Sequence, residues 1–122
     1  MAVTNIDLSA ISGAQLHVNT DVDETEDDVD GGAGTLWAIE VDNTGNAAVT
    51  YVKLYNAASG AVTVGTTAPD FIFAVPASVS RAIIFPQGFA YSTALSIAAV
   101  TAGGTAGTTG PTSLVTARVV YS

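Results

Sequence analysis

The chain has 122 residues, which fits one domain that buries about two thirds of the surface its unfolded form would expose. Charged residues make up 11% of it, hydrophobic residues 48%, and the formal net charge is −8. Nucleic acids and anionic membranes are bound mainly through Lys and Arg, and only Lys53, Arg81 and Arg118 are present, so we expect neither partner. The absence of cysteine excludes disulfides and thiolate metal sites.

Two kinds of targeting segment are not expected. The longest apolar runs are far shorter than the run of about 18 residues that a membrane helix needs. The first five residues, MAVTN, lack the basic and apolar regions of a Sec-type signal peptide.

The few charges are unevenly distributed along the chain. Seven of the eleven acidic residues lie between Asp21 and Asp30, whereas Arg81 and Arg118 are the only charged side chains from Phe71 onward. A soluble monomer usually spreads charge over its whole surface. The C-terminal half is therefore expected to contact other protein, with a solvated face rich in Thr and Ser as the alternative.

Short β-like runs, rich in Val, Thr and Ala and bounded by turn residues, recur along the chain. This pattern predicts an all-β fold, an antiparallel β-sandwich of jelly-roll or immunoglobulin-like topology with about eight strands. We expect one domain over residues 15–122, preceded by an N-terminal arm over residues 1–14. The expected strands cover residues 15–20, 35–42, 48–56, 70–75, 78–85, 88–92, 94–101 and 114–121.

Alternation within two of these runs predicts which side chains face the core. In the run 49–55, Val52 and Leu54 point inward, and the opposite face carries a ladder of Tyr51, Lys53 and Tyr55. In the run 36–42, Trp37 falls on the same face as Ile39 and Val41, so we expect the only tryptophan in the core.

Turn residues separate the predicted strands. The segment DNTGN (42–46) predicts a hairpin or a tight corner, and PQG (86–88) a further turn. The segment TAGGTAGTTGP (101–111) predicts a loop that is mobile or ordered only by a neighbouring molecule.

The sequence offers little for catalysis. Acid, base or nucleophilic catalysis needs at least two positioned groups, yet the only histidine, His17, belongs to no motif, and no nucleophile elbow or phosphate loop occurs. We expect His17 to be a half-buried strand residue. The chain is not expected to be an enzyme or to need a cofactor.

The acidic run over residues 21–30 is the one feature that suggests a small ligand. Glu26, Asp28 and Asp30, followed by Gly31, imitate the first half of a calcium-binding loop, but the closing glutamate position is occupied by Trp37. Such a run is more often a solvated loop or a surface facing a basic partner. No metal site is therefore predicted, and these three residues remain weak candidates only.

Four segments carry a resemblance to a known group of proteins. They are TYVKLYNAAS (50–59), VGTTAPD (64–70), FPQG (85–88) and STAL (92–95). In this order they resemble small virion structural proteins of tailed bacteriophages, over residues 36–121. Ala94 departs from the pattern, which often has glycine there. The resemblance implies a β-sandwich protein of the virion that decorates or cements the capsid, or forms part of a tail or neck.

On this basis the leading hypothesis is a capsid cement protein located in the virion, a homo-oligomer, most naturally a trimer, that bridges subunits of the major capsid protein. The residues expected at its contacts are Tyr51, Lys53, Tyr55, Phe89, Tyr91 and Arg118. The alternative is a tail, neck or fibre component that binds glycan on the host surface. A third hypothesis is a calcium-dependent adhesion module built on the acidic run.

Overall fold

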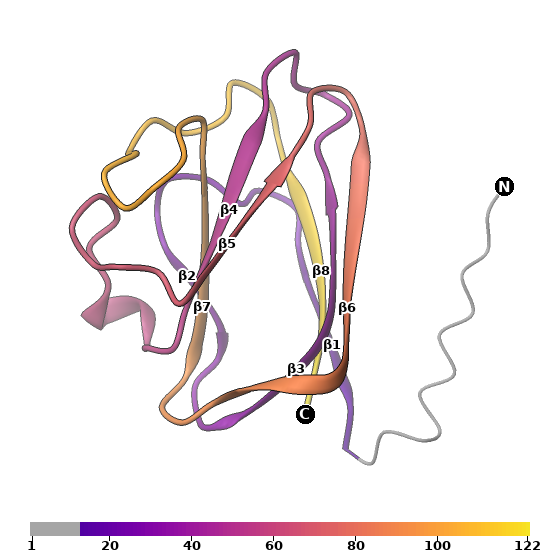
Figure 1. The fold of residues 1–122 in the computed structure, drawn as a ribbon, viewed down its shortest axis with the longest axis vertical. Helices are drawn as coiled ribbons and strands as arrows, with labels where there is room; N and C mark the ends of the chain where they lie inside the picture. The colour runs from indigo at the N-terminus through magenta and orange to yellow at the C-terminus, as the bar shows by residue number, and fades with distance from the viewer. Residues whose placement is uncertain (1–12) are drawn as a thin grey trace, which may run out of the picture.

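The computed structural model describes residues 13–122, so most of the predicted N-terminal arm lies outside the described residues. The described chain forms eight strands in two four-stranded antiparallel sheets (Figure 1). This arrangement confirms the predicted all-β sandwich. The strands are β1 (Gln15–Asn19), β2 (Asp27–Asp30), β3 (Gly34–Asp42), β4 (Thr50–Tyr55), β5 (Phe71–Val75), β6 (Ser80–Tyr91), β7 (Leu95–Val100) and β8 (Thr116–Tyr121), with a short 3-10 helix η2 (Ser59–Ala61) after β4.

The strand order identifies the topology as a jelly roll. One sheet has the order β1-β8-β3-β6 and the other β2-β7-β4-β5. The first half of the chain therefore pairs with the second half in reverse order, β1 with β8, β2 with β7, β3 with β6 and β4 with β5. An immunoglobulin fold would instead place the second strand beside the first in one sheet. Of the two predicted topologies, the jelly roll is the one formed.

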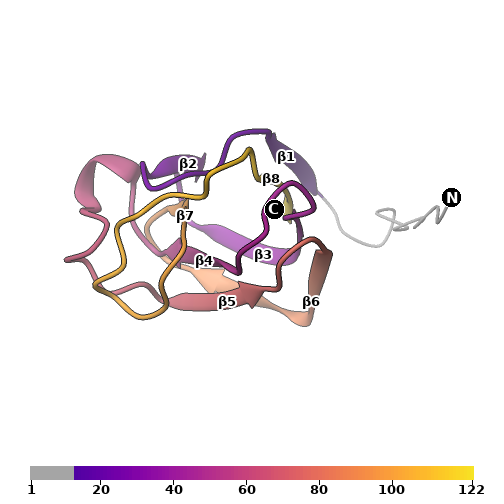
Figure 2. The ribbon, with the colours of Figure 1, turned by 90° about the horizontal axis from the view of Figure 1, so that it is seen from above.

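The core lies between the two sheets and is built mainly from aliphatic side chains. Leu36, Ile39 and Val41 come from β3, Val52 and Leu54 from β4, and Leu95, Ile97 and Ala99 from β7. Figure 2 shows the two layers from above. Val52 and Leu54 are buried between the sheets, as their alternation predicts.

The structure corrects the predicted element boundaries in two places. The acidic run contains β2, which the sequence did not predict, and the two strands predicted at 78–85 and 88–92 form one long strand, β6. Between the pairs Leu36 with Phe89 and Ala38 with Ile84, one residue of β3 faces four residues of β6. The PQG segment therefore makes a bulge within β6, helped by a positive φ of 75° at Gly88, and does not end the strand.

The same irregularity overturns the prediction for Trp37. Leu36 is fully buried in the core and Trp37 is only half-buried, because the bulge between Leu36 and Ala38 breaks the two-residue alternation. Trp37 Nε1 donates a hydrogen bond of 2.9 Å to Ser122 Oγ. The indole ring contacts Gly88, where an added Cβ would lie 3.2 Å from the ring. Trp37 thus belongs to the outer side of the β1–β8–β3–β6 sheet.

The DNTGN segment forms the predicted corner, which carries the chain from one sheet to the other. Asn43 is fully buried, and its Nδ2 donates to the carbonyl oxygens of Ala48, Val75 and Pro76. Its Oδ1 accepts hydrogen bonds from Asn46 and from Thr50. One side chain therefore fastens three segments at this end of the sandwich.

Candidate functional site

Three of the six residues predicted to contact other proteins are buried inside the molecule. Lys53 and Tyr55 of β4 are 0% and 1% exposed, and Tyr51 is half-buried. The predicted open ladder on β4 is therefore wrong. The physical reason is that two loops, residues 56–69 and 101–111, lie over the outer face of the β2–β7–β4–β5 sheet (Figure 1).

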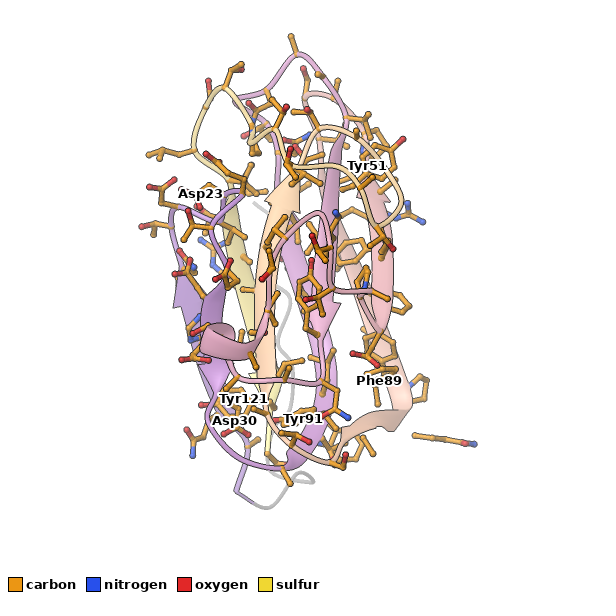
Figure 3. The ribbon with its side chains drawn as sticks, turned by 90° about the vertical axis from the view of Figure 1, so that its left-hand side faces the viewer. Asp23, Asp30, Tyr51, Phe89, Tyr91 and Tyr121 are labelled. Carbon is orange, nitrogen blue, oxygen red and sulfur yellow. The ribbon has the colours of Figure 1, made fainter. Side chains whose placement is uncertain are left out.

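Lys53 fastens the glycine-rich loop to this face. Its Nζ donates hydrogen bonds of 3.1 Å to the carbonyl oxygen of Thr105 and 2.9 Å to that of Gly107. Burial lowers the pKa of the ammonium group from its usual value. The loop is thus ordered by the domain itself, whereas the sequence predicted a mobile segment or one ordered by a neighbouring molecule. Tyr51 lies beside this loop (Figure 3), and Gly103 packs against its ring.

A second, smaller hydrophobic cluster forms under the other loop. It contains Tyr55, Val62 and Ala98, with Ala57 and Val64 packed against them. The hydroxyl of Tyr55 has no hydrogen-bond partner, and burial, aided by the charge of Glu26, raises its pKa. Tyr55 serves this internal packing and is not a contact residue.

Tyr91 and Phe89 of β6 also make contacts within the domain. Tyr91 is 1% exposed and its hydroxyl donates a hydrogen bond of 2.7 Å to Asp30 Oδ2. Burial and this hydrogen bond raise the pKa of the phenol. Phe89 is half-buried in an aromatic group with Phe71 and Phe85, whose ring centroids lie 6.2 Å and 5.9 Å from its own.

The acidic run is spread along the molecule and does not form one cluster. Asp23 and Asp30 lie toward opposite ends of the face seen in Figure 3. The Asp28 carboxylate accepts hydrogen bonds from the backbone N–H and the hydroxyl of Ser59, and Asp30 accepts one from Tyr91. Within residues 13–122, no three His, Cys, Asp or Glu side chains are grouped as metal ligands. The three weak candidates, Glu26, Asp28 and Asp30, do not converge on one point.

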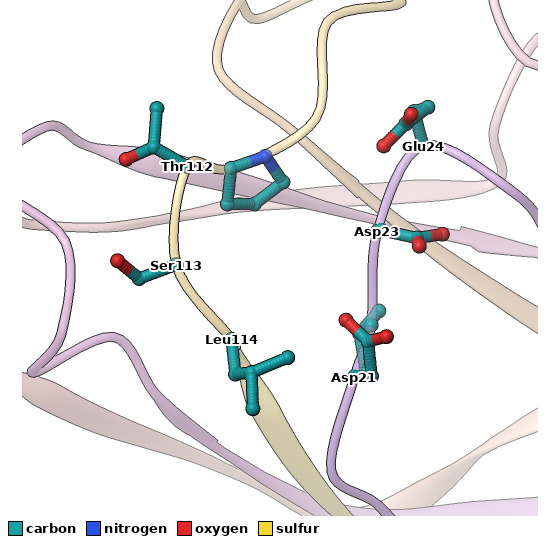
Figure 4. Close-up of a pocket in the computed structure, with 8 residues that line it drawn as sticks. Asp21, Asp23, Glu24, Thr112, Ser113 and Leu114 are labelled. Carbon is teal, nitrogen blue, oxygen red and sulfur yellow. The ribbon is translucent and has the colours of Figure 1, made fainter.

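A cleft of about 410 Å³ lies where the segment before β2 passes the segment before β8 (Figure 4). One wall carries Asp21, Asp23 and Glu24, and the other carries Thr112, Ser113 and the exposed Leu114. The walls are held together by a hydrogen bond of 2.9 Å from the Val22 N–H to the Val115 carbonyl. The lining holds three carboxylates and no cationic side chain, so the cleft is strongly acidic.

Three of the five exposed large hydrophobic residues of the described chain lie on the outer face of the β1–β8–β3–β6 sheet. Leu16 is 57%, Val18 49% and Ile84 66% exposed. Strand pairing arranges this face in two rows, Leu16–Val120–Ala38–Ile84 and Val18–Arg118–Glu40–Ala82. No other part of the described chain lies over this face (Figure 1). We call these eight residues the outer-face rows.

Arg118 is the one predicted contact residue that is exposed, and it lies in these rows. Its Nη1 donates a hydrogen bond of 3.1 Å to Glu40 Oε1, and this is the ion pair of the described residues. Sequence reasoning missed Leu16, Val18 and Ile84. A signal existed in Ile83-Ile84, because neighbouring strand residues point to opposite faces and one of the two must point away from the core.

The fold and these surfaces define a jelly-roll β-sandwich with one apolar outer sheet face. Neither the comparison with protein-family models nor that with curated proteins finds a match for this chain. The described residues include no helix with the length and hydropathy that a membrane span requires.

Proposed function

We propose that this protein is a structural protein of a bacteriophage virion, a cement or decoration protein of the capsid. It acts by contacts with copies of itself and with the major capsid protein, and it uses neither catalysis nor a cofactor. Each copy would bridge neighbouring coat subunits and so raise the resistance of the shell to internal pressure.

The observation that carries this proposal is the set of outer-face rows. Leu16 and Val18 on β1 and Ile84 on β6 are large, apolar and exposed at the two edges of one sheet face. Large apolar side chains exposed on one sheet face mark protein contact sites in soluble proteins. An ordered sheet also loses little conformational entropy on docking, which favours repeated contacts in a lattice.

Two further points support a role in the virion. Four segments of the sequence resemble small phage virion proteins, and this support is an analogy of sequence pattern. The jelly roll is a fold that viral capsid proteins share with lectins and cupins, and this is an analogy of fold alone.

The alternative role, glycan binding from a tail or fibre, receives less support. It needs an exposed aromatic platform, whereas on β4 Tyr55 is 1% exposed and Tyr51 is half-buried. Trp37 is half-buried on the outer sheet face. A glycan array that compares wild type with Trp37→Ala would test whether this ring binds sugar.

The proposal is tested by adding purified protein to particles that lack it and measuring bound protein and survival of heat or osmotic shock. We expect wild-type protein to bind and to raise survival, and Ile84→Asp to bind at least about tenfold more weakly, because a contact would bury the new carboxylate. Leu114→Asp is the matched control, since Leu114 is 67% exposed but lies outside the outer-face rows. Particles that gain no protein and no resistance with wild-type protein would overturn the proposal.

A further inference from the structure

We propose that the occupant of the outer-face rows is a second copy of this chain, docked sheet against sheet about a two-fold axis. The axis would run parallel to the strands, between β8 and β3. This inference rests on the proposed function, because it names the partner of the surface that carries that function.

The first argument is the order of side-chain sizes across the sheet. In the first outer-face row, Leu16 and Ile84 stand at the two ends, and Val120 and Ala38 stand between them. Rotation about an axis between β8 and β3 lays β1 of one copy over β6 of the other. Leu16 then meets the second copy's Ile84, and Val120, of which only 5% is exposed, lies opposite the second copy's Ala38. The most exposed side chains thus cover each other, while a small residue faces a larger one in the centre.

The second argument is charge. The second outer-face row holds Arg118 and Glu40 on the two central strands. The same rotation lays Arg118 over the second copy's Glu40 and Glu40 over its Arg118, so that opposite charges alternate in a group of four. A charge arrangement that complements itself is what a two-fold contact requires.

The third argument is the position of the remaining acidic residues. The chain carries a formal net charge of −8, which opposes self-association over most of its surface. The seven acids of residues 21–30 lie in β2 and in the segment that precedes it, outside the outer-face rows. The outer-face rows hold one cation and one anion, already paired, and Asp42 of β3 adjoins them on the same face. Two copies therefore meet less repulsion here than beside the acidic run.

The size of the face sets the expected strength. Strands about 4.8 Å apart with a rise of about 3.3 Å per residue, overlapping over the lengths of β1 and β8, give a contact on the order of 350 Å² per copy. Stable complexes bury about 800 Å² per partner, so we expect a weak, reversible dimer. Sheets stacked in this way lie about 10 Å apart with their strands roughly aligned.

The experiment is analytical ultracentrifugation of the full chain over a wide concentration range. We expect a monomer–dimer equilibrium for wild type, a dissociation constant raised at least about tenfold by Ile84→Asp, and no change with Leu114→Asp. Circular dichroism melting of each variant checks that it is folded.

A charge exchange tests the position of the axis. Arg118→Glu alone and Glu40→Arg alone should each dimerise more weakly than wild type, because each sets like charges opposite each other. An equal mixture of the two variants should recover the dimer, since each then supplies what the other lacks. A mixture no stronger than the single variants would overturn the proposed two-fold arrangement.

The outcomes separate this inference from the proposed function. Wild-type protein that stays monomeric at millimolar concentration, or that forms a trimer, overturns the two-fold dimer. If Ile84→Asp then still loses particle binding, the face contacts coat protein and the proposed function stands. A dimer that never binds particles leaves this inference intact and overturns the proposed function.

Discussion

Lys53 donates a hydrogen bond of 2.9 Å to the carbonyl oxygen of Gly107, and this contact holds a glycine-rich loop over the outer face of the β2–β7–β4–β5 sheet. The loop contains no large apolar residue, so its order depends on polar contacts with the sheet. The two faces of the sandwich differ as a result. One is covered by the chain itself, and the other presents the outer-face rows.

The Lys53→Met variant tests how the loop is held. Methionine keeps the apolar stem but removes the donors that bind the Thr105 and Gly107 carbonyls. We expect the backbone amides of residues 101–111 to exchange hydrogen at least about tenfold faster, since local opening then costs less free energy. Arg81→Met is the control, because Arg81 donates to the Ala74 carbonyl on β5, away from the loop. Unchanged protection of the loop amides would contradict this account of its order.

The Tyr55→Phe and Tyr91→Phe variants should change stability in opposite directions. Tyr55 buries a hydroxyl without a hydrogen-bond partner, so its removal should raise the free energy of unfolding by about 1 kcal/mol. Removing the Tyr91 hydroxyl deletes the hydrogen bond to Asp30 and should lower it by about 1 to 2 kcal/mol. Urea unfolding measures both, and the same sign for both variants would refute the assignment.

The tyrosines also predict a pH dependence. Burial raises the pKa of Tyr55 and of Tyr91 above the usual value of 10.0. Above pH 10 the unfolded chain therefore releases protons that the folded chain retains, so the stability they contribute is lost as pH rises. Burial lowers the pKa of Lys53 in the folded chain. Between that pKa and 10.5 the unfolded chain holds a proton that the folded chain has released, so this group makes stability rise with pH. We expect the Tm of wild type to fall more steeply above pH 10 than the Tm of Tyr91→Phe. Equal slopes of Tm against pH in the two proteins would contradict the raised pKa of Tyr91.

Asn43 should be the most sensitive polar position of the sandwich. The Asn43→Ala variant removes five hydrogen bonds at a buried corner and leaves the Val75 carbonyl without this partner. We expect a loss of about 3 kcal/mol or more in the free energy of unfolding. Thr44→Ala, at an exposed residue that bonds only to Asp42, should cost less than about 1 kcal/mol. Similar losses in the two variants would show that the corner is not held by Asn43.

Calcium should leave the protein unchanged. The carboxylates of Asp28 and Asp30 accept hydrogen bonds from different parts of the chain, Ser59 and Tyr91. A cation site needs several oxygens that converge on one point. We expect the same Tm in millimolar calcium chloride and in excess chelator. A saturable rise with calcium would revive the calcium-dependent adhesion hypothesis.

Much of the fold could be predicted from the sequence because its strands alternate clearly. The run 49–55 places Val52 and Leu54 inside, as it predicts, and His17 is half-buried as expected. The choice of jelly roll depends on pairs such as β1 with β8, which are distant in the sequence and leave no local pattern. β2 escaped prediction because it is an edge strand in which only Val29 reaches the core.

The candidate surface could be predicted only in part. Local alternation correctly separates the two faces of β4, but it cannot show that Thr105 and Gly107 return to cover Lys53. Nor can it show that a bulge moves Trp37 out of the core. The outer-face rows are exposed because no other segment of residues 13–122 covers them, and local sequence patterns do not show this.

The copy number of this protein in purified particles, measured by quantitative mass spectrometry against the major capsid protein, tests the central claim most directly. A cement protein of the shell predicts hundreds of copies per particle, in a fixed ratio to the coat subunits. A few to dozens of copies would contradict the capsid role and indicate a tail, neck or fibre component, and complete absence from the particle would contradict the virion assignment itself.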